Sequence, residues 1–295
     1  NRPQLLLETV QSVLKNIDLP GEIVIIDDSE TPNVELAAMK DLGPCFVRYI
    51  WSNSIGLSRA RNEGMRIASH EILAFIDDDM QVPSTWYRAL IHAVVQAGRK
   101  SVVAGRVLPG PNENPGSFVP PPETSDIPHI YEGRIGTDVL ASLHMAMYRS
   151  AFEEVGGFDE RLGPGTRFPS AEDNDYGFRF LEAGYRIVYA PEAMIYHRAW
   201  RGRNDYFPLR WAYGRGKGGY YTKYLSLKDS YMLRRMCWDI GFRLLRFPWR
   251  LLHRPQLALG DLVYVCGILS GAAEWVWTGR GKQPFARIPE RTQGA

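Results

Sequence analysis

The chain has 295 residues, of which 45% are hydrophobic and 23% charged, so it can bury a large core and has the composition of an ordinary globular protein. Its 3 cysteines are far apart and form no CxxC pair, which argues against a disulfide scaffold or a zinc site and is typical of a reducing compartment. The net charge of +2 conceals an acidic region up to residue 197 and a basic region after it, so we expect the later region to meet an anionic partner.

The first third of the chain alternates between helical and strand patterns. Apolar residues at helical spacing indicate an opening helix around residues 6–14. Further helices are predicted over 58–68 and 84–97, and strands over 22–26, 48–51, 72–76 and 102–104. This alternation is typical of βαβ units in a mostly parallel sheet, whose ligands bind beyond the carboxyl ends of the strands.

The middle of the chain is less regular. Residues 109–128 are dense in Pro, Gly and Asn and predict a long loop, of the kind that is functional or disordered. An apolar segment over 140–148, a helix over 171–183 closed by Gly184, and short strands over 186–189 and 194–196 are expected after it. We predict two domains, with residues 1–205 forming the α/β domain and residues 206–295 a basic helical region.

Three consecutive carboxylates, Asp77, Asp78 and Asp79, follow the apolar run 72–76. Like charges gathered at a strand end repel one another unless something offsets them. A divalent cation such as Mg²⁺ or Mn²⁺ is one candidate, because hard cations take carboxylate oxygens and keep positions for substrate phosphates. A solvated acidic turn or a helix cap is the alternative. Asp27 and Asp28 also follow a predicted strand, so one crevice can hold both clusters.

The order of short motifs along residues 1–200 resembles that of family 2 glycosyltransferases, which have the GT-A fold. No single motif is specific, but the ordered set is. It comprises Asn1-Arg2-Pro3, Ile25-Ile26-Asp27-Asp28-Ser29, Asn53 with Gly56, Ala60-Arg61-Asn62-Glu63-Gly64, Phe75-Ile76-Asp77-Asp78-Asp79, Val155-Gly156-Gly157-Phe158-Asp159, Glu172-Asp173, Gly184, Pro191 and His197.

The resemblance implies a Rossmann-like, mostly parallel sheet flanked by helices, with a C-terminal helical extension. It also implies metal-dependent inverting transfer of a sugar from a nucleoside-diphosphate sugar to a lipid-linked or polysaccharide acceptor. Family members carry an apolar strand just before the Asn-Arg-Pro segment. Its absence here implies a trimmed chain or a start further upstream, and we expect a weakened nucleotide pocket unless another segment substitutes.

The resemblance places nucleotide-sugar contacts at two early segments. Asp27 and Asp28 are expected to accept hydrogen bonds from the base and the ribose, and Asn53 to lie beside them. The alternative for the two aspartates is capping of the next helix. Arg61 is expected to reach the base or the diphosphate, and a solvated arginine is the alternative.

The carboxylate triplet looks like the DxD motif of the family. If strand geometry continues, Asp77 and Asp79 lie on one face, because alternate residues of a strand point the same way. Asp77 is then expected to contact the ribose or the metal, Asp79 to bind Mn²⁺ or Mg²⁺, and Asp78 to lie near the nucleotide sugar as the expendable middle residue. His197 resembles the histidine that completes the metal shell, and a structural histidine is the alternative.

Asp173 is the candidate catalytic base, and Glu172 is expected to help position the acceptor or the base. An inverting transfer needs one carboxylate opposite the leaving group, which takes the proton from the attacking hydroxyl. The alternative is a pair of acidic residues favoured by the dipole at a helix N-terminus. Trp200 and Arg203 are predicted to belong to a mobile lid over the diphosphate, extended by Arg210-Trp211 and the glycine-rich run 214–219.

Residues 229–278 are predicted to make peripheral contact with a membrane. Between 229 and 252 apolar residues cluster on one helical face, beside a stripe of Arg235, Arg243, Arg246, Arg250 and Arg254. Packing of the apolar side on the catalytic domain, with solvated arginines, is the alternative. Pro248 predicts two short helices rather than one. The stretch 257–278 contains Asp261 and Glu274, which argues against a transmembrane helix.

We therefore predict a cytoplasmic enzyme, peripheral on the inner face of the plasma membrane, with no nucleic-acid role because no recognition module is found. A nucleotidyltransferase on a similar sheet is a second candidate, but the glycine-rich phosphate loop expected near its start is missing. The alternative from another class is a catalytically impaired glycosyltransferase-like protein that binds a nucleotide sugar or a glycan without turnover.

Overall fold

The computed structural model describes residues 2–39, 45–52, 56–112, 117–118, 124–199, 201–226 and 229–279. The described residues pack as two compact units. The first contains residues up to 55, 59–157 and 176–201, and the second contains 56–58, 158–175 and the residues from 202 onward. The predicted domain boundary at residue 205 stays a prediction, since the second unit also takes in the earlier loop 158–175.

The first unit contains two sheets. β1 (Glu22–Asp27) pairs in parallel with β2 (Phe46–Trp51). The larger sheet has the order β3 (Ile72–Ile76), β7 (His144–Tyr148), β5 (Ser101–Asn112), β8 (Arg186–Ala199) and β4 (Met80–Gln81), and β6 (His129–Tyr131) also pairs with β8. β5 and β8 are parallel, and β7 is antiparallel to both β3 and β5. β3, β5 and β8 therefore all point in the same direction.

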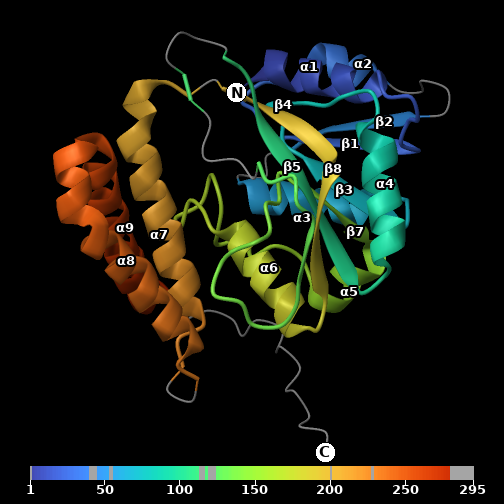
Figure 1. The fold of residues 1–295 in the computed structure, drawn as a ribbon. Helices are drawn as coiled ribbons and strands as arrows, with labels where there is room; N and C mark the ends of the chain where they lie inside the picture. Colours follow the sequence, from blue (N-terminus) through green and yellow to red (C-terminus); the bar gives the residue numbers. More distant parts are fainter. Residues whose placement is uncertain are drawn as a thin grey trace, which may run out of the picture. The chain divides into compact units, whose positions relative to one another are not determined.

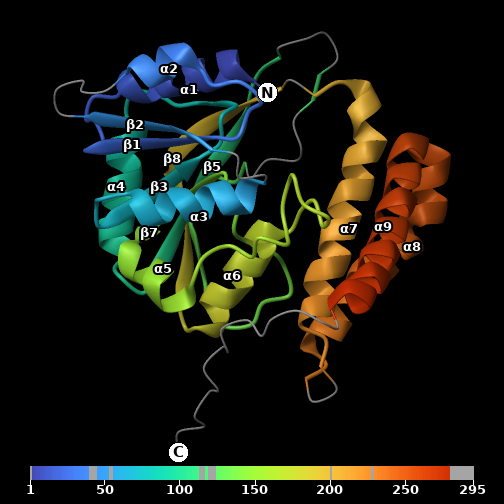
Figure 2. The same ribbon diagram turned by 180° about the vertical axis from the view of Figure 1, so that it is seen from behind.

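Helices cover both faces of the larger sheet. Figures 1 and 2 show α4 (Trp86–Ala97) on one face and α3 (Leu57–Ile67) on the other. α1 (Pro3–Leu14) and α2 (Val34–Ala38) pack on the β1–β2 pair through a small core around Leu36 and Val47. α5 (Arg149–Val155) follows β7, and α6 (Glu172–Glu182) contributes its part from Tyr176 onward. The α/β layering is therefore the one that the alternating pattern predicts.

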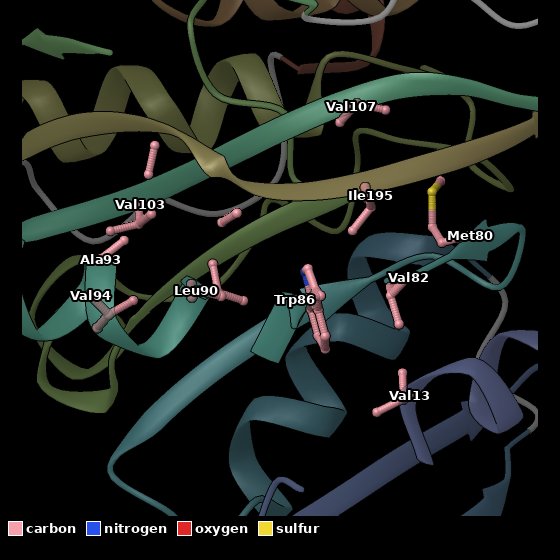
Figure 3. Packing of buried hydrophobic residues seen from close by; sticks show 13 residues of the cluster. Val13, Met80, Val82, Trp86, Leu90, Ala93, Val94, Val103, Val107 and Ile195 are labelled. Atoms are coloured by element: carbon pink, nitrogen blue, oxygen red, sulfur yellow. The ribbon is translucent and has the colours of Figure 1, made fainter. Parts of the chain in front are cut away.

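The main core lies between α4 and the sheet. Trp86, Leu90 and Val94 are spaced four residues apart, so they line one face of α4, and all three are buried. They point toward Val103 and Ile195 of the sheet (Figure 3). The helix predicted over 84–97 is thus present as α4, and these apolar residues form its buried face.

His144 is a fully buried polar residue in this core. Its Nε2 accepts a hydrogen bond of 2.9 Å from the indole N–H of Trp86. A Cβ added at Gly105 would come within 2.0 Å of the imidazole, so β5 needs glycine at this point. Burial lowers the pKa of His144 to about 4 from 6.5, so the ring stays neutral in the folded protein.

The neutral His144 is expected to make the protein sensitive to mild acid. Between pH 6.5 and 4 the unfolded chain binds a proton at this position and the folded chain does not, so the free energy of unfolding falls as the pH falls. The loss from this group is about 2 kcal/mol at pH 5. Urea unfolding across this range is the measurement, with His144→Gln reducing the pH dependence and the exposed His92→Gln leaving it intact. An unchanged slope in His144→Gln would contradict the prediction.

Two predicted boundaries in the first unit were wrong. The strands expected over 186–189 and 194–196 form the single strand β8, which continues past a shift in its pairing with β5 at Gly105/Arg106. The start of the predicted loop, residues 109–112, instead extends β5. Pairing with the long β8 holds these Pro- and Gly-containing residues in the sheet. Residues 113–116 and 119–123 of the predicted loop lie outside the described residues.

The second unit is helical after residue 202. A short 3₁₀ turn at Arg203–Asp205 precedes α7 (Tyr206–Lys223), α8 (Tyr231–His253) and α9 (Pro255–Gly279), which are the long helices drawn in orange to red in Figure 1. The prediction that residues 210–219 belong to a mobile lid was wrong, because they form α7. Its glycines are used for close contact: a Cβ added at Gly218 would lie 2.1 Å from the carbonyl oxygen of Ile268 on α9.

The prediction of two short helices around Pro248 was also wrong. α8 is continuous from Tyr231 to His253, with Pro248 inside it. Proline removes one backbone hydrogen bond but does not end a helix that tertiary packing holds in place. Here α9 packs along α8 and supplies ion pairs to Arg243 and Arg250 on either side of the proline.

Candidate active site

The three carboxylates occupy a turn rather than the end of a strand. β3 ends at Ile76, and the chain turns through Asp77–Asp79 before β4 begins at Met80. The prediction that Asp77 and Asp79 share a strand face therefore does not hold, because strand geometry stops before them. Burial raises the pKa of the Asp78 carboxyl to about 6, and the charges of Asp79 and Asp77 add to this, while Arg2 opposes it. The turn thus holds mutually repelling charges.

Arg61 fixes Asp77. Its guanidinium donates hydrogen bonds of 2.5 Å to the Asp77 carboxylate and 2.6 Å to the hydroxyl of Ser142. Arg61 is buried on α3, so the alternative of a solvated arginine is wrong. The pair brings α3 to the carboxylate turn and places a fixed positive charge there.

Arg2 offsets the other two charges of the turn. It donates to both carboxylate oxygens of Asp78, at 3.1 and 2.5 Å, and to Asp79 at 2.8 Å. The hydroxyl of Thr9 on α1 lies 2.8 and 2.7 Å from the carbonyl oxygens of Asp78 and Met80. The carboxylate turn is therefore held by Arg2 at the N-terminal end of α1 and by Thr9 in the second helical turn of α1. The sequence contained a signal for this role, since three aspartates need a cation, but nothing in it pointed to Arg2.

His197 meets Asp79 because of the strand register. Met80 of β4 pairs with His197 of β8, and the Arg198 N–H donates to the Asp79 carbonyl at 3.0 Å. The His197 Nε2 then lies 3.9 Å from Asp79 Oδ1, with both side chains buried. Its Nδ1 is 3.0 Å from the Arg198 carbonyl oxygen, so Nδ1 donates to this oxygen and Nε2 is the ring nitrogen that faces the carboxylate.

This pair fits two ligands of a divalent cation. A carboxylate oxygen and an imidazole nitrogen are suitable donors, and the bond from Nδ1 to a backbone carbonyl is the support that metal-bound histidines usually have. Within the described residues, no group of three or more His, Cys, Asp or Glu side chains could hold a metal ion. A cation at Asp79 and His197 would therefore take its other ligands from water or from substrate phosphates.

Asp27 is engaged within its own strand pair. Its carboxylate accepts hydrogen bonds from the Ser29 backbone at 3.0 Å, the Ser29 hydroxyl and the Tyr49 hydroxyl at 2.6 Å. Burial would raise the pKa of Asp27, but these bonds outweigh it and hold the pKa below its usual value. Burial and the bond to Asp27 raise the pKa of Tyr49 to about 12. Asp28 beside it is exposed.

The alternative that Asp27 or Asp28 caps the next helix is wrong. Asn33 caps α2, with its side chain accepting from the N–H groups of Glu35 and Leu36. The nucleotide-binding roles of Asp27 and Asp28 stay predictions. The predicted contacts Asn53 and Trp200 lie outside the described residues, as does Asn1 of the first motif.

The predicted base and its neighbour open α6, in the second unit. Glu172 is buried and Asp173 half-buried, and Asp173 accepts a hydrogen bond of 2.8 Å from the Asn174 N–H. Ala171 just before them has a φ of 69°, a left-handed conformation that is costly for a residue with a Cβ. Gly163 lies against Glu172, where an added Cβ would be 3.2 Å from its carboxyl carbon. Arg203 is exposed in the 3₁₀ turn.

A buried ion network beneath this segment was not predicted. Lys223 at the end of α7 binds the fully buried Asp175, and its Nζ lies 2.9 Å from Asp159. Tyr224 donates to Asp175 at 2.7 Å, and Arg161 binds Asp159 at 2.9 Å. Within the second unit, the network ties the first residues of α6 and the loop before them to α7. Only Asp159, the last residue of one motif, and Asp175, two residues after another, hinted at it, because Lys223 is 48 residues from Asp175 in the chain.

Replacing Lys223 by Met is expected to lower the free energy of unfolding by about 3–5 kcal/mol, because two buried carboxylates lose a shared cation. Thermal or urea unfolding followed by circular dichroism measures this change. Lys15→Met, which removes an exposed lysine, is the matched control and should stay within about 0.5 kcal/mol of the unchanged protein. Equal stabilities of the two variants would contradict a structural role for the network.

Comparison with known proteins decides the family. The sequence model described as glycosyl transferase family 2 matches residues 1–156, which is more than half of the chain. The chain belongs to glycosyl transferase family 2. This family 2 protein is 26% identical over 211 residues to the glucosyl-dolichyl phosphate glucuronosyltransferase of Haloferax volcanii, covering 68% of the chain and 66% of the relative.

A second relative is the O-antigen chain rhamnosyltransferase WbaN of Salmonella anatum. It is 25% identical over 194 residues, which cover 62% of this chain and 58% of the relative. The family 2 protein thus spans less than two thirds of the length of either relative.

Solved structures show that the fold is GT-A. The mannosyltransferase PcManGT from Pyrobaculum calidifontis, solved in complex with GDP-Man and Mn²⁺, superposes with a TM-score of 0.60. The superposition covers 93% of this chain and 85% of that one at 14% identity. The predicted resemblance to a family 2 glycosyltransferase and the predicted GT-A fold are therefore confirmed.

Proposed function

We propose that this family 2 protein is a metal-dependent inverting glycosyltransferase that moves a sugar from a nucleoside-diphosphate sugar to a lipid-linked or polysaccharide acceptor. The observation that carries the proposal is the meeting of Asp79 with His197 across the β4–β8 register, beside the Arg61–Asp77 pair. Family membership supports the proposal. The names of the two relatives refer to a glucosyl-dolichyl phosphate and to an O-antigen chain.

Asp79 and His197 would hold Mn²⁺ or Mg²⁺, with Asp77 beside them. Bound there, the cation supplies positive charge to the diphosphate as it leaves. Two arginines keep the carboxylates in place, since the buried Arg61 bonds to Asp77, and the half-buried Arg2 bonds to both Asp78 and Asp79. With Asp27, Asp28, Asn53, Trp200 and Arg203, these residues make up the proposed nucleotide-sugar site.

Asp173 is the proposed general base, with Glu172 positioning it. In the reaction the acceptor oxygen forms a bond to the anomeric carbon while the bond from that carbon to the diphosphate oxygen breaks. The Asp173 carboxylate takes the proton of the acceptor hydroxyl, and the electron pair of the broken bond leaves with the diphosphate. The bond from the Asn174 N–H to Asp173 Oδ1 helps to hold the carboxylate at the start of α6.

The proposed acceptor is lipid-linked or a polysaccharide, and we propose that the enzyme works at the cytoplasmic face of a membrane that it contacts through residues 229–278. Apolar side chains exposed on α8 and α9 support this contact. One described helix, α9 over Pro255–Thr278, is long and apolar enough to cross a bilayer, which on its own is weak evidence.

Release of nucleoside diphosphate from donor sugars tests the activity. A screen of nucleotide sugars for thermal stabilisation in Mn²⁺ first identifies the donor, because a ligand that binds the folded state raises its stability. We expect the donor so found to be hydrolysed slowly with Mn²⁺ and not after addition of EDTA. Hydrolysis that is unaffected by EDTA would refute metal dependence.

A second candidate is a protein that binds the nucleotide sugar without turnover. The contact that favours it is the Arg2 guanidinium, which lies 2.8 Å from Asp79 and could replace a metal ion as the countercharge. Arg2→Ala separates the two candidates. If the protein is an enzyme, donor hydrolysis stays dependent on Mn²⁺ in this variant. If it only binds, donor binding needs no Mn²⁺ in the unchanged protein and is lost in Arg2→Ala.

A further inference from the structure

Three of the five arginines of the α8 stripe turn inward, which neither arrangement predicted from the sequence includes, whereas Arg246 and Arg254 are exposed. Arg235 is buried with its guanidinium 3.1 Å from the Tyr220 hydroxyl. Arg243 is paired with Asp239 on its own helix, and Arg250 with Asp261 on α9. These arginines therefore neither face an anionic surface nor stand in solvent, and charge does not dominate the outer face of α8.

The outer face of α8 is instead apolar. Its exposed side chains recur at intervals of three and four residues, which places them in one stripe along the helix. Trp238 is 71% exposed, Leu245 81% and Leu252 82%. The stripe consists of Trp238, Phe242, Leu245, Trp249 and Leu252.

α9 presents a second stripe of the same kind. Both carboxylates of this helix turn inward, where Asp261 binds Arg210 and Arg250, and Glu274 binds Arg215. Between residues 259 and 277 the exposed side carries only apolar and small residues at helical spacing. It consists of Leu259, Leu262, Cys266, Leu269, Ala273 and Val276, with Trp277 beside them.

The three-helix unit of α7, α8 and α9 thus pairs charged groups in its interior and exposes two apolar stripes. Tyr264 lies in its interior between the guanidinium groups of Arg210 and Arg243, at 4.6 and 4.1 Å from the ring centre. A helix of a water-soluble domain turns its apolar face inward. Helices in a bilayer turn ionisable side chains toward one another, because charge is costly against lipid. The distribution of polar and apolar side chains in this unit matches that of helices in a bilayer.

The packing of α7 on α9 is also of the membrane type. Gly214 and Gly218 of α7 face Gly267 and Gly271 of α9, so each helix has a GxxxG pair on the shared side. A Cβ at Gly271 would lie 2.1 Å from the Arg215 carbonyl oxygen. Such close backbone contact is characteristic of helices in lipid, where apolar burial between helices adds little.

The exposed charges favour a lipid surface over a second copy of the chain. Within the described residues of 229–279 no acidic residue is exposed, whereas Arg234, Arg246, His253 and Arg254 are. This basic set is complementary to anionic lipid headgroups and would repel itself across a symmetric interface. α9, with 25 residues, is about 37 Å long, compared with about 30 Å for the hydrocarbon layer of a bilayer.

We propose that α8 and α9 form a hairpin that inserts the two apolar stripes into the hydrocarbon layer of a lipid bilayer. This inference deepens the membrane contact in the proposed function, and rests on it, by assigning the contact to apolar insertion instead of to the arginine stripe. Binding should then persist at about 1 M NaCl, where electrostatic attraction is screened within about 3 Å.

Flotation of the full chain with phosphatidylcholine vesicles, with or without phosphatidylglycerol, tests the proposal. We expect the protein to float with both kinds of vesicle and to stay bound at high salt. The triple variant Leu245→Ser, Trp249→Ser and Leu252→Ser should lose about 100-fold in partitioning. The matched control Val34→Ser, Ile127→Ser and Ile130→Ser, which changes three exposed apolar residues of the first unit, should bind as the unchanged protein does.

Release of the unchanged protein by salt would assign the contact to charge and overturn the proposal. So would a soluble dimer, seen by light scattering, that the triple variant of α8 abolishes while neither form binds vesicles. Because the altered residues are exposed, circular dichroism should show both variants folded. If the serine variants are misfolded, a second measurement uses the unchanged protein with vesicles that carry spin labels on their acyl chains. These labels should quench its tryptophan fluorescence, and the double variant Trp238→Phe and Trp249→Phe should show less quenching. Donor hydrolysis is measured separately, so either proposal can fail alone.

Discussion

Replacing Asp173 by Asn is expected to lower the rate of sugar transfer by about 10³-fold while leaving the affinity for the nucleotide sugar unchanged. The amide oxygen of Asn can still accept the hydrogen bond that Asp173 receives from the Asn174 N–H, so the start of α6 should stay in place. What is lost is the carboxylate that takes the proton of the acceptor hydroxyl. Steady-state transfer kinetics and equilibrium donor binding, measured on the same preparation, separate the two effects.

The same substitution at a surface aspartate is the control for Asp173→Asn. Asp18→Asn removes an exposed carboxylate that pairs with Arg88, and transfer should be unaffected. Transfer at the original rate in Asp173→Asn would show that the base lies elsewhere. Loss of donor affinity together with activity would instead assign Asp173 to the nucleotide-sugar site.

Replacing Asp79 by Asn is expected to weaken Mn²⁺-dependent donor binding by about 100-fold, because the buried carboxylate is the proposed anionic ligand of the cation. His197→Gln should weaken it in the same direction, by about 10-fold to 100-fold. Calorimetric titration of the nucleotide sugar at several Mn²⁺ concentrations gives both affinities.

Asp78→Ser is the neighbouring variant to compare. Asp78 bonds to Arg2 but does not face His197, so we expect donor affinity within a few fold of the original. His129→Gln, at an exposed histidine, is the control for His197→Gln. Asp78→Ser losing as much affinity as Asp79→Asn would mean that the middle carboxylate, and not the last, binds the cation.

Much of the first unit could be predicted from the sequence. The helix over Trp86–Ala97 and the strand over Ile72–Ile76 lie where the apolar spacing placed them, since each buries one face or both. The motif order also predicted the family and the GT-A fold. The join of two short strands into β8 could not be predicted, because it depends on pairing with β5.

The sequence could name the carboxylates of the candidate site but not their partners. Asp77, Asp78 and Asp79 are neighbours in the chain, whereas Arg2, Arg61 and His197 reach them through α1, α3 and the β4–β8 pairing. Contacts between residues so far apart in the chain depend on how the helices and strands pack. The spacing of residues along the sequence does not reveal this packing.

The C-terminal helices show most clearly what the sequence determines and what only the tertiary structure decides. The sequence by itself determined that apolar residues between 229 and 252 cluster on one helical face, beside a stripe of arginines. Only the tertiary structure decided which stripe faces outward. Asp239 pairs with Arg243 and the buried Asp261 with Arg250, because a buried carboxylate needs a countercharge. These pairs turn both arginines inward, while the tryptophans and leucines stay exposed.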